Sequence, residues 1–142
     1  MKITVLDAQT LGFDGSEWAS LSRLGELTLH PATGHSLDHV LAHADGADVV
    51  LTNKVPLRAD ALAALTNLKL ISVLATGYNI IDLEAAKKSG VTVCNVPAYS
   101  SASAAQHAVA LILELCNNCG LHSESVHAGD WTRSPHFCYW KK

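Results

Sequence analysis

The sequence predicts an α/β fold in which helices cover both faces of a parallel β-sheet. Five short β-rich segments alternate with helical or turn-rich segments, and a glycine or asparagine follows most of the helical ones. Each connection is long enough to cross over between parallel strands. We therefore expect a flavodoxin-like, doubly wound sheet with the strand order 2-1-3-4-5.

The elements of this fold follow from apolar runs and from helix end signals. We expect strands at residues 3–6, 27–29, 49–52, 70–74 and 91–96. We expect helices between them at residues 17–24, 37–44, 58–65 and 83–89. The last helix has the clearest signals, because Asp82 suits its N-cap, Glu84 its first turn, Lys87 and Lys88 its last turn, and Gly90 its stop. Residues 1–100 are predicted to form one domain.

A longer helix is predicted at residues 104–116. Ser103 and Gln106 have the spacing of a capping box, and the helix then carries few polar residues. A helix that is apolar all round must be covered on several sides, which suits a position between two domains. After it, four aromatic residues either contact another surface or belong to a disordered end. These residues are Trp131, Phe137, Tyr139 and Trp140.

The composition excludes several classes of partner. The chain has 142 residues, of which 49% are hydrophobic and 16% charged, as is typical of a soluble globular domain. Its formal net charge of -3 and the lack of a basic cluster argue against binding to nucleic acid. No apolar run reaches the roughly 18 residues of a membrane span, and the N-terminus does not resemble a secretory signal. We therefore expect a cytoplasmic protein with no membrane partner.

Metal and redox sites have weak support in the sequence. Cys116 and Cys119 have redox or zinc spacing, but Cys116 ends an apolar helix, where a thiol behaves as a small core residue. His35, His39 and His43 recur every four residues, and we expect them on a solvated helix face, since no carboxylate or thiolate completes a metal site. No metal is predicted, and reduced thiols are expected.

The candidate binding site is the sheet edge at which the parallel strands end, because ligands of open α/β sheets bind there. Thr76 and Gly77 stand out on this edge. Adjacent amides in a glycine turn can hold a small anion, and Gly77 either adopts a positive φ or lets a ligand approach the backbone closely. The loops that meet at this edge contain Asp7 and residues 52–54, 75–78 and 97–100.

These segments resemble the NAD-dependent D-isomer-specific 2-hydroxyacid dehydrogenases, and within them the glycerate dehydrogenase branch, which reduces hydroxypyruvate or glyoxylate. The resemblance extends over residues 1–142. It implies a substrate domain at residues 1–100, followed at 101–142 by the inter-domain helix and the start of a truncated NAD-binding domain. The segments that carry it are Thr52-Asn53-Lys54, Ala75-Thr76-Gly77-Tyr78-Asn79-Ile80-Ile81-Asp82, Asn95-Val96-Pro97-Ala98-Tyr99-Ser100 and Ala105-Gln106-His107.

The resemblance also implies roles for individual residues. Thr76 and Gly77 would bind the carboxylate of a small 2-oxo or 2-hydroxy acid, and Thr76 would also lie near the nicotinamide of NAD or NADP. His107 is interpreted as a structural residue, hydrogen-bonded at the domain junction. The predicted substrate-binding residues are Asn53, Lys54, Ala75, Thr76, Gly77 and Tyr99.

The family's catalytic Arg, acidic residue and His have no counterpart in this sequence, and no G-x-G-x-x-G occurs in it. We therefore expect the isolated chain to be inactive and the complete enzyme to be a homodimer. Lys54 could instead be a solvated surface charge, and Tyr99 could fill a gap between sheet and helix.

Two other functions remain open. The chain could be a stand-alone flavodoxin-like binding or regulatory module, although residues 52–54 lack the carboxylate that a phospho-receiver needs. It could also be a truncated polypeptide that persists as a dimer or pairs with another chain. A hydrolase has little support, since no G-x-S-x-G is present.

Overall fold

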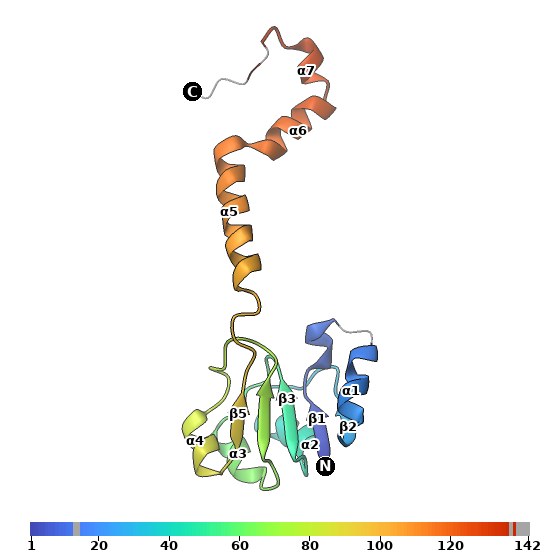
Figure 1. The fold of residues 1–142 in the computed structure, drawn as a ribbon, viewed down its shortest axis with the longest axis vertical. Coiled ribbons are helices and arrows are strands. Elements are labelled where there is room, and N and C mark those ends of the chain that lie inside the picture. The colour runs from blue at the N-terminus through green and yellow to red at the C-terminus, as the bar shows by residue number, and fades with distance from the viewer. Residues whose placement is uncertain (13–14, 137, 139–142) are drawn as a thin grey trace. The chain divides into compact units, whose positions relative to one another are not determined.

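The computed structural model describes residues 1–12, 15–136 and 138, and the chain divides into two compact units, Met1–Tyr99 and Ser100–Lys142. The first unit contains a five-stranded sheet in the order β2-β1-β3-β4-β5 (Figure 1). All neighbouring strands are parallel, which confirms the predicted α/β class and strand order. The strands are β1 (Lys2–Val5), β2 (Glu26–Leu29), β3 (Val49–Thr52), β4 (Leu70–Val73) and β5 (Thr92–Cys94).

Helices cover the two faces of this sheet unequally. Successive strand residues point to opposite faces, so Val50 lies in one hydrophobic cluster and Leu51 in the other. The larger cluster joins the sheet to α2 (Leu37–Ala44), α3 (Ala59–Ala64) and α4 (Leu83–Lys88). In the smaller cluster, Trp18 packs with Ile3, Val5 and Leu51.

The segment between β1 and β2 differs from the predicted single helix at residues 17–24. It forms two short 3-10 helices, η1 (Ala8–Leu11) and η2 (Ser16–Trp18), and one turn of α-helix, α1 (Ala19–Ser22). Glycine is required where the chain then enters β2, because a Cβ on Gly25 would overlap the carbonyl oxygen of Met1. That carbonyl already accepts a 3.0 Å hydrogen bond from the amide of Glu26.

The predicted end signals of α4 are confirmed. The Asp82 side chain accepts a 2.9 Å hydrogen bond from the Ala85 amide, as an N-cap does. Gly90 has a φ of +70°, which a side chain would disfavour.

The second unit contains α5 (Ser101–Asn117), α6 (Cys119–His127) and α7 (Asp130–Arg133), none of which has a buried residue. The predicted capping box is wrong, because α5 begins at Ser101 and so both Ser103 and Gln106 lie inside it. The observed N-cap is Ser100, whose side chain forms no capping hydrogen bond. Phe137, Tyr139 and Trp140 lie outside the described residues.

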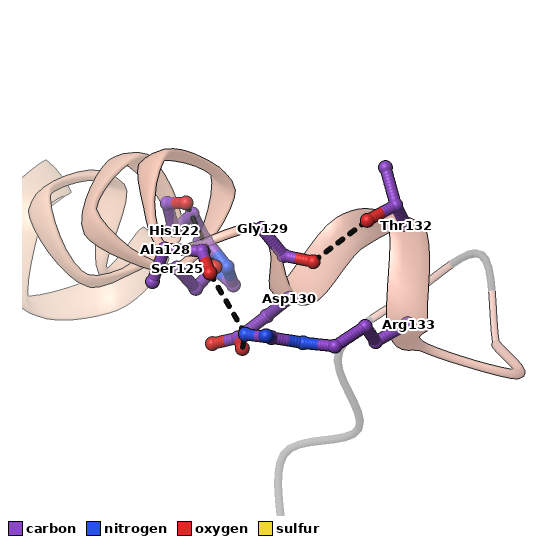
Figure 2. A network of polar contacts seen from close by, with 7 residues as sticks. All are labelled: His122, Ser125, Ala128, Gly129, Asp130, Thr132 and Arg133. Carbon is purple, nitrogen blue, oxygen red and sulfur yellow. Dashed lines mark hydrogen bonds and ion pairs between the residues drawn. The ribbon is translucent and has the colours of Figure 1, made fainter.

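Local polar contacts join α6 to α7 (Figure 2). The Arg133 guanidinium donates 2.7 Å hydrogen bonds to the Ala128 carbonyl and to the Asp130 carboxylate. The Thr132 hydroxyl donates to the Gly129 carbonyl at 2.9 Å. Among the described helices, none is both long and apolar enough to cross a membrane.

Candidate functional site

The candidate site is the rim formed at the carboxyl ends of the strands in the first unit. Because the sheet is parallel, the loops that follow β1, β3, β4 and β5 meet at one edge (Figure 1). This edge brings together Asp7, the loop at residues 53–54, the loop at residues 75–78 and the loop at residues 95–99.

Asp7 organises the loop after β3. Its side chain is buried, and its carboxylate accepts the amide of Asn53 at 2.9 Å and the amide of Lys54 at 2.5 Å. The next turn closes through Thr52, whose hydroxyl oxygen accepts the Val55 amide at 3.1 Å. The backbone amides after β3 therefore form an anion-binding turn, and this turn is already occupied by the Asp7 carboxylate.

The side chain of Asn53 is engaged as well. Its amide nitrogen donates to the Thr10 hydroxyl at 3.0 Å, and that hydroxyl donates to the Asp7 carbonyl at 2.8 Å. In contrast, the Lys54 side chain is exposed, and no described residue forms an ion pair with it. Lys54 is thus a free positive charge on the rim.

The loop after β5 holds the loop after β4 in place. The Thr76 hydroxyl donates to the Val96 carbonyl at 3.0 Å, and the Asn95 side-chain amide donates to the Thr76 carbonyl at 2.8 Å. A backbone bond of 3.1 Å joins the Val96 amide to the Ala75 carbonyl. Ala75 and Thr76 are therefore fixed through their oxygen atoms.

The amides of Thr76 and Gly77 remain free. Both residues are exposed, and neither amide donates a hydrogen bond to any described residue. Gly77 is not in the left-handed region, so of its two predicted roles the positive φ does not apply. A Cβ built on Gly77 would meet only the Asn79 side chain, at 3.4 Å, so a ligand can approach the backbone from solvent.

An apolar groove of about 540 Å³ lies within the same unit. Tyr99, which is 66% exposed, lines it and does not fill a gap in the core. Next to Tyr99, Ala98 has a φ of 58°, which is unfavourable for a residue with a side chain. The other residues that line the groove are Leu11, Glu17, Trp18, Leu21, Leu51, Leu74 and Val96.

Several expectations about histidine and cysteine are corrected. His35 lies before α2, and His43 is half-buried against other groups instead of on a solvated face. His107 is exposed on α5, and its ring forms no hydrogen bond with a described residue. Cys116 is exposed and not part of a core. In the part of the chain that the structure describes, no three potential ligands are placed to hold a metal ion.

Comparison with known proteins decides the family. Residues 8–132 match the family model described as D-isomer specific 2-hydroxyacid dehydrogenase, catalytic domain. The chain belongs to the D-isomer specific 2-hydroxyacid dehydrogenase family. A hydroxypyruvate reductase of Blautia hydrogenotrophica is 39% identical over 141 residues, which are 99% of this chain and 44% of that protein. A glycerate dehydrogenase of Methylorubrum extorquens is 40% identical over 72% of this chain and 32% of its own length.

Solved structures of dehydrogenases in this family share the fold. D-2-hydroxyisocaproate dehydrogenase has a TM-score of 0.71 and 26% identity, with 99% of this chain and 43% of that chain covered. The apo D-lactate dehydrogenase of Escherichia coli has a TM-score of 0.68 and 25% identity, with 92% and 41% covered. The chain thus spans less than half the length of these relatives.

Proposed function

We propose that this chain is the substrate-binding part of an NAD(P)-dependent oxidoreductase that interconverts small 2-oxo and 2-hydroxy acids. Glyoxylate, hydroxypyruvate and D-glycerate are the proposed substrates, in keeping with the printed names of the hydroxypyruvate reductase and glycerate dehydrogenase relatives. The observation that carries the proposal is the pair of free, exposed amides at Thr76 and Gly77 on the rim.

Each rim residue has a proposed role in holding the acid. The amides of Thr76 and Gly77 donate to the carboxylate, and the ammonium group of Lys54 adds a positive charge beside it. The Asn53 side chain keeps its oxygen for a substrate hydroxyl, because its nitrogen is bound to Thr10. Ala75 shapes the loop through its bonded carbonyl, and Tyr99 borders the site.

The residues present do not fit a whole dinucleotide. The family and the NADPH complex of one structural relative indicate a nicotinamide cofactor, which would supply the hydride. Thr76 could lie near a nicotinamide, but the sequence has no glycine-rich turn to hold the phosphates. We therefore propose that residues 1–100 are the substrate domain and that the isolated chain has no dehydrogenase activity.

Titration with oxamate, an unreactive analogue of a 2-oxo acid, tests the binding proposal. We expect the backbone ¹⁵N–¹H signals of Thr76 and Gly77 to shift most. The Gly77→Ala variant should bind at least about tenfold more weakly, because a methyl group blocks a charge-assisted hydrogen bond. Lys54→Ala should weaken binding several-fold, and Lys87→Ala, which removes a charge from α4, should not.

The result that would contradict this proposal is equal oxamate affinity of the wild type and the Gly77→Ala variant. An NADH oxidation assay with glyoxylate or hydroxypyruvate tests inactivity separately, and clear turnover by the isolated chain would refute it. If oxamate binds as expected without turnover, the chain supplies the acid site alone.

We also propose that the apolar residues of α5 are covered in the complete enzyme, which we expect to be a homodimer. Leu111, Ile112 and Leu115 are 52%, 58% and 80% exposed. Sedimentation of the purified chain should therefore show concentration-dependent association. The Leu115→Glu variant should weaken this association, whereas a monomer at all concentrations would argue against a role for α5 in assembly.

A further inference from the structure

Two histidine rings stack on each other at the side of the sheet where β2 forms the edge. His30 directly follows β2, and His43 lies in the last turn of α2. Their ring centroids are 3.8 Å apart, and the ring planes differ by 7°. Both residues are half-buried, so their charge states affect how these two elements pack.

The hydroxyl of Thr33 determines where His43 carries its proton. Thr33 is buried, and its Oγ1 lies 2.6 Å from the Leu6 carbonyl and 2.8 Å from His43 Nδ1. The carbonyl can only accept, so the single hydroxyl proton is donated to it. His43 Nδ1 must therefore be the donor to Thr33, and a second proton on this ring would go to Nε2.

Protonation of both rings is unfavourable in this arrangement. The pKa of His30 is lowered from its ordinary value of 6.5, first by burial and then by the charge of His43, while the backbone of His43 opposes this shift. A cavity of about 240 Å³ next to the two rings is lined by charged side chains from β1, from β2 and from the residue after α2. Lys2 of β1 adds a positive charge there, and Glu26 of β2 and Asp45 after α2 add negative ones.

We propose that the stacked His30 and His43 rings form a pH-sensitive latch that holds residues 30–33 against the end of β1 at neutral pH and releases them in acid. His30 is bonded to β1 and to η1, since its amide donates to the Val5 carbonyl at 2.9 Å and its carbonyl accepts the Ala8 amide at 2.9 Å. Thr33 adds the bond to Leu6. Asp7, which holds the rim loop after β3, lies in the sequence between Leu6 and Ala8, which form two of these hydrogen bonds.

The direction of the pH effect follows from proton linkage. A folded state in which His30 resists protonation binds fewer protons than the unfolded state. The stabilisation by the neutral stack is therefore complete above the ordinary histidine pKa of 6.5 and is lost as the pH falls through the lowered value. Each unit by which the pKa is lowered corresponds to about a tenfold change in the opening equilibrium.

Amide hydrogen exchange and histidine NMR titration of the full chain test this latch. Between pH 7.5 and pH 5.0, protection factors at Ala8 and His30 should fall at least about tenfold for each unit of pKa lowering. The protection at Ile71 in β4, an interior strand of the sheet, should not change. The wild-type ring signal of His30 should titrate below the ordinary histidine pKa of 6.5.

Three variants separate the latch from general acid destabilisation. His43→Asn keeps a donor for Thr33 but cannot be charged, and His30→Phe keeps a flat ring. Both should lose the pH-dependent opening at Ala8, while His35→Asn should behave like the wild type. Unchanged pH dependence in both latch variants would overturn the proposal, as would ordinary titration of His30. If a variant fails to fold, the wild-type titration and exchange data decide alone.

Discussion

Asp7 holds the backbone of the rim loop at residues 53–54 in place. It is 3% exposed and forms no ion pair with a described residue, and its carboxylate accepts hydrogen bonds from the amides of Asn53 and Lys54. A buried carboxylate held in this way fixes two backbone units that would otherwise need other partners. Asp7 is thus a positioning residue for the loop that presents Lys54.

Removing this carboxylate should destabilise the first unit. We expect Asp7→Ala to lower the free energy of unfolding by about 2 kcal/mol, because it leaves two amides without an acceptor. Asp7→Asn keeps one acceptor oxygen and should cost less. Urea unfolding measures both variants. The surface variant Asp38→Asn, in the first turn of α2, should change stability by no more than about 0.5 kcal/mol.

The backbone of Ala98 adopts a left-handed conformation that should reduce the stability of the first unit. Its φ of 58° is one that glycine adopts at no cost. We expect Ala98→Gly to stabilise the first unit by about 0.5 to 1 kcal/mol. Ala63→Gly in α3 should instead destabilise it by about 1 kcal/mol. If both variants lose stability equally in thermal unfolding, the backbone at Ala98 is not strained.

At the scale of elements, α4 was predictable from its own sequence. Its N-cap, first turn, last turn and terminating glycine act within one helix, so no distant contact was needed to identify them. The segment between β1 and β2 was not predictable in this way. Trp18 is buried there against Ile3 and Val5, and this long-range packing splits the expected helix into shorter pieces.

The N-cap of α4 gives a direct test of this local control. Asp82→Ala should reduce stability by about 1 kcal/mol, because the Ala85 amide loses its acceptor. Asp82→Ser keeps an oxygen at the cap and should recover most of this loss. Chemical denaturation distinguishes the two variants. Equal losses in both would mean that the charge of Asp82, and not its cap geometry, stabilises the helix.

At the scale of the whole molecule, the core belongs to the first unit. Every buried hydrophobic residue among those described lies between Ile3 and Val91, and α5, α6 and α7 bury none. The cooperative part of the chain is therefore the parallel sheet with its covering helices. The polar contacts of the second unit are local, such as those of Arg133 with Ala128 and Asp130.

A chain that ends at Tyr99 should consequently keep the thermal transition of the full chain. We expect the two melting temperatures to agree within about 4 °C, which corresponds to less than about 1 kcal/mol for a domain of this size. The helical circular dichroism signal should fall, since α5 to α7 are removed. A large drop in melting temperature would show that the second unit stabilises the sheet.

Local signals in the sequence were enough to predict the strand order and the family and to indicate the loop at Thr76 and Gly77 as a candidate site. Apolar periodicity and glycine placement are local signals, and the segments that resemble the family are continuous. The hydrogen-bond partners of the rim residues became known only from the folded chain. The Asp7 carboxylate binds amides 46 and 47 residues away, and His30 meets His43 across two elements. Such contacts depend on how the chain folds back on itself, and no spacing along the sequence records them.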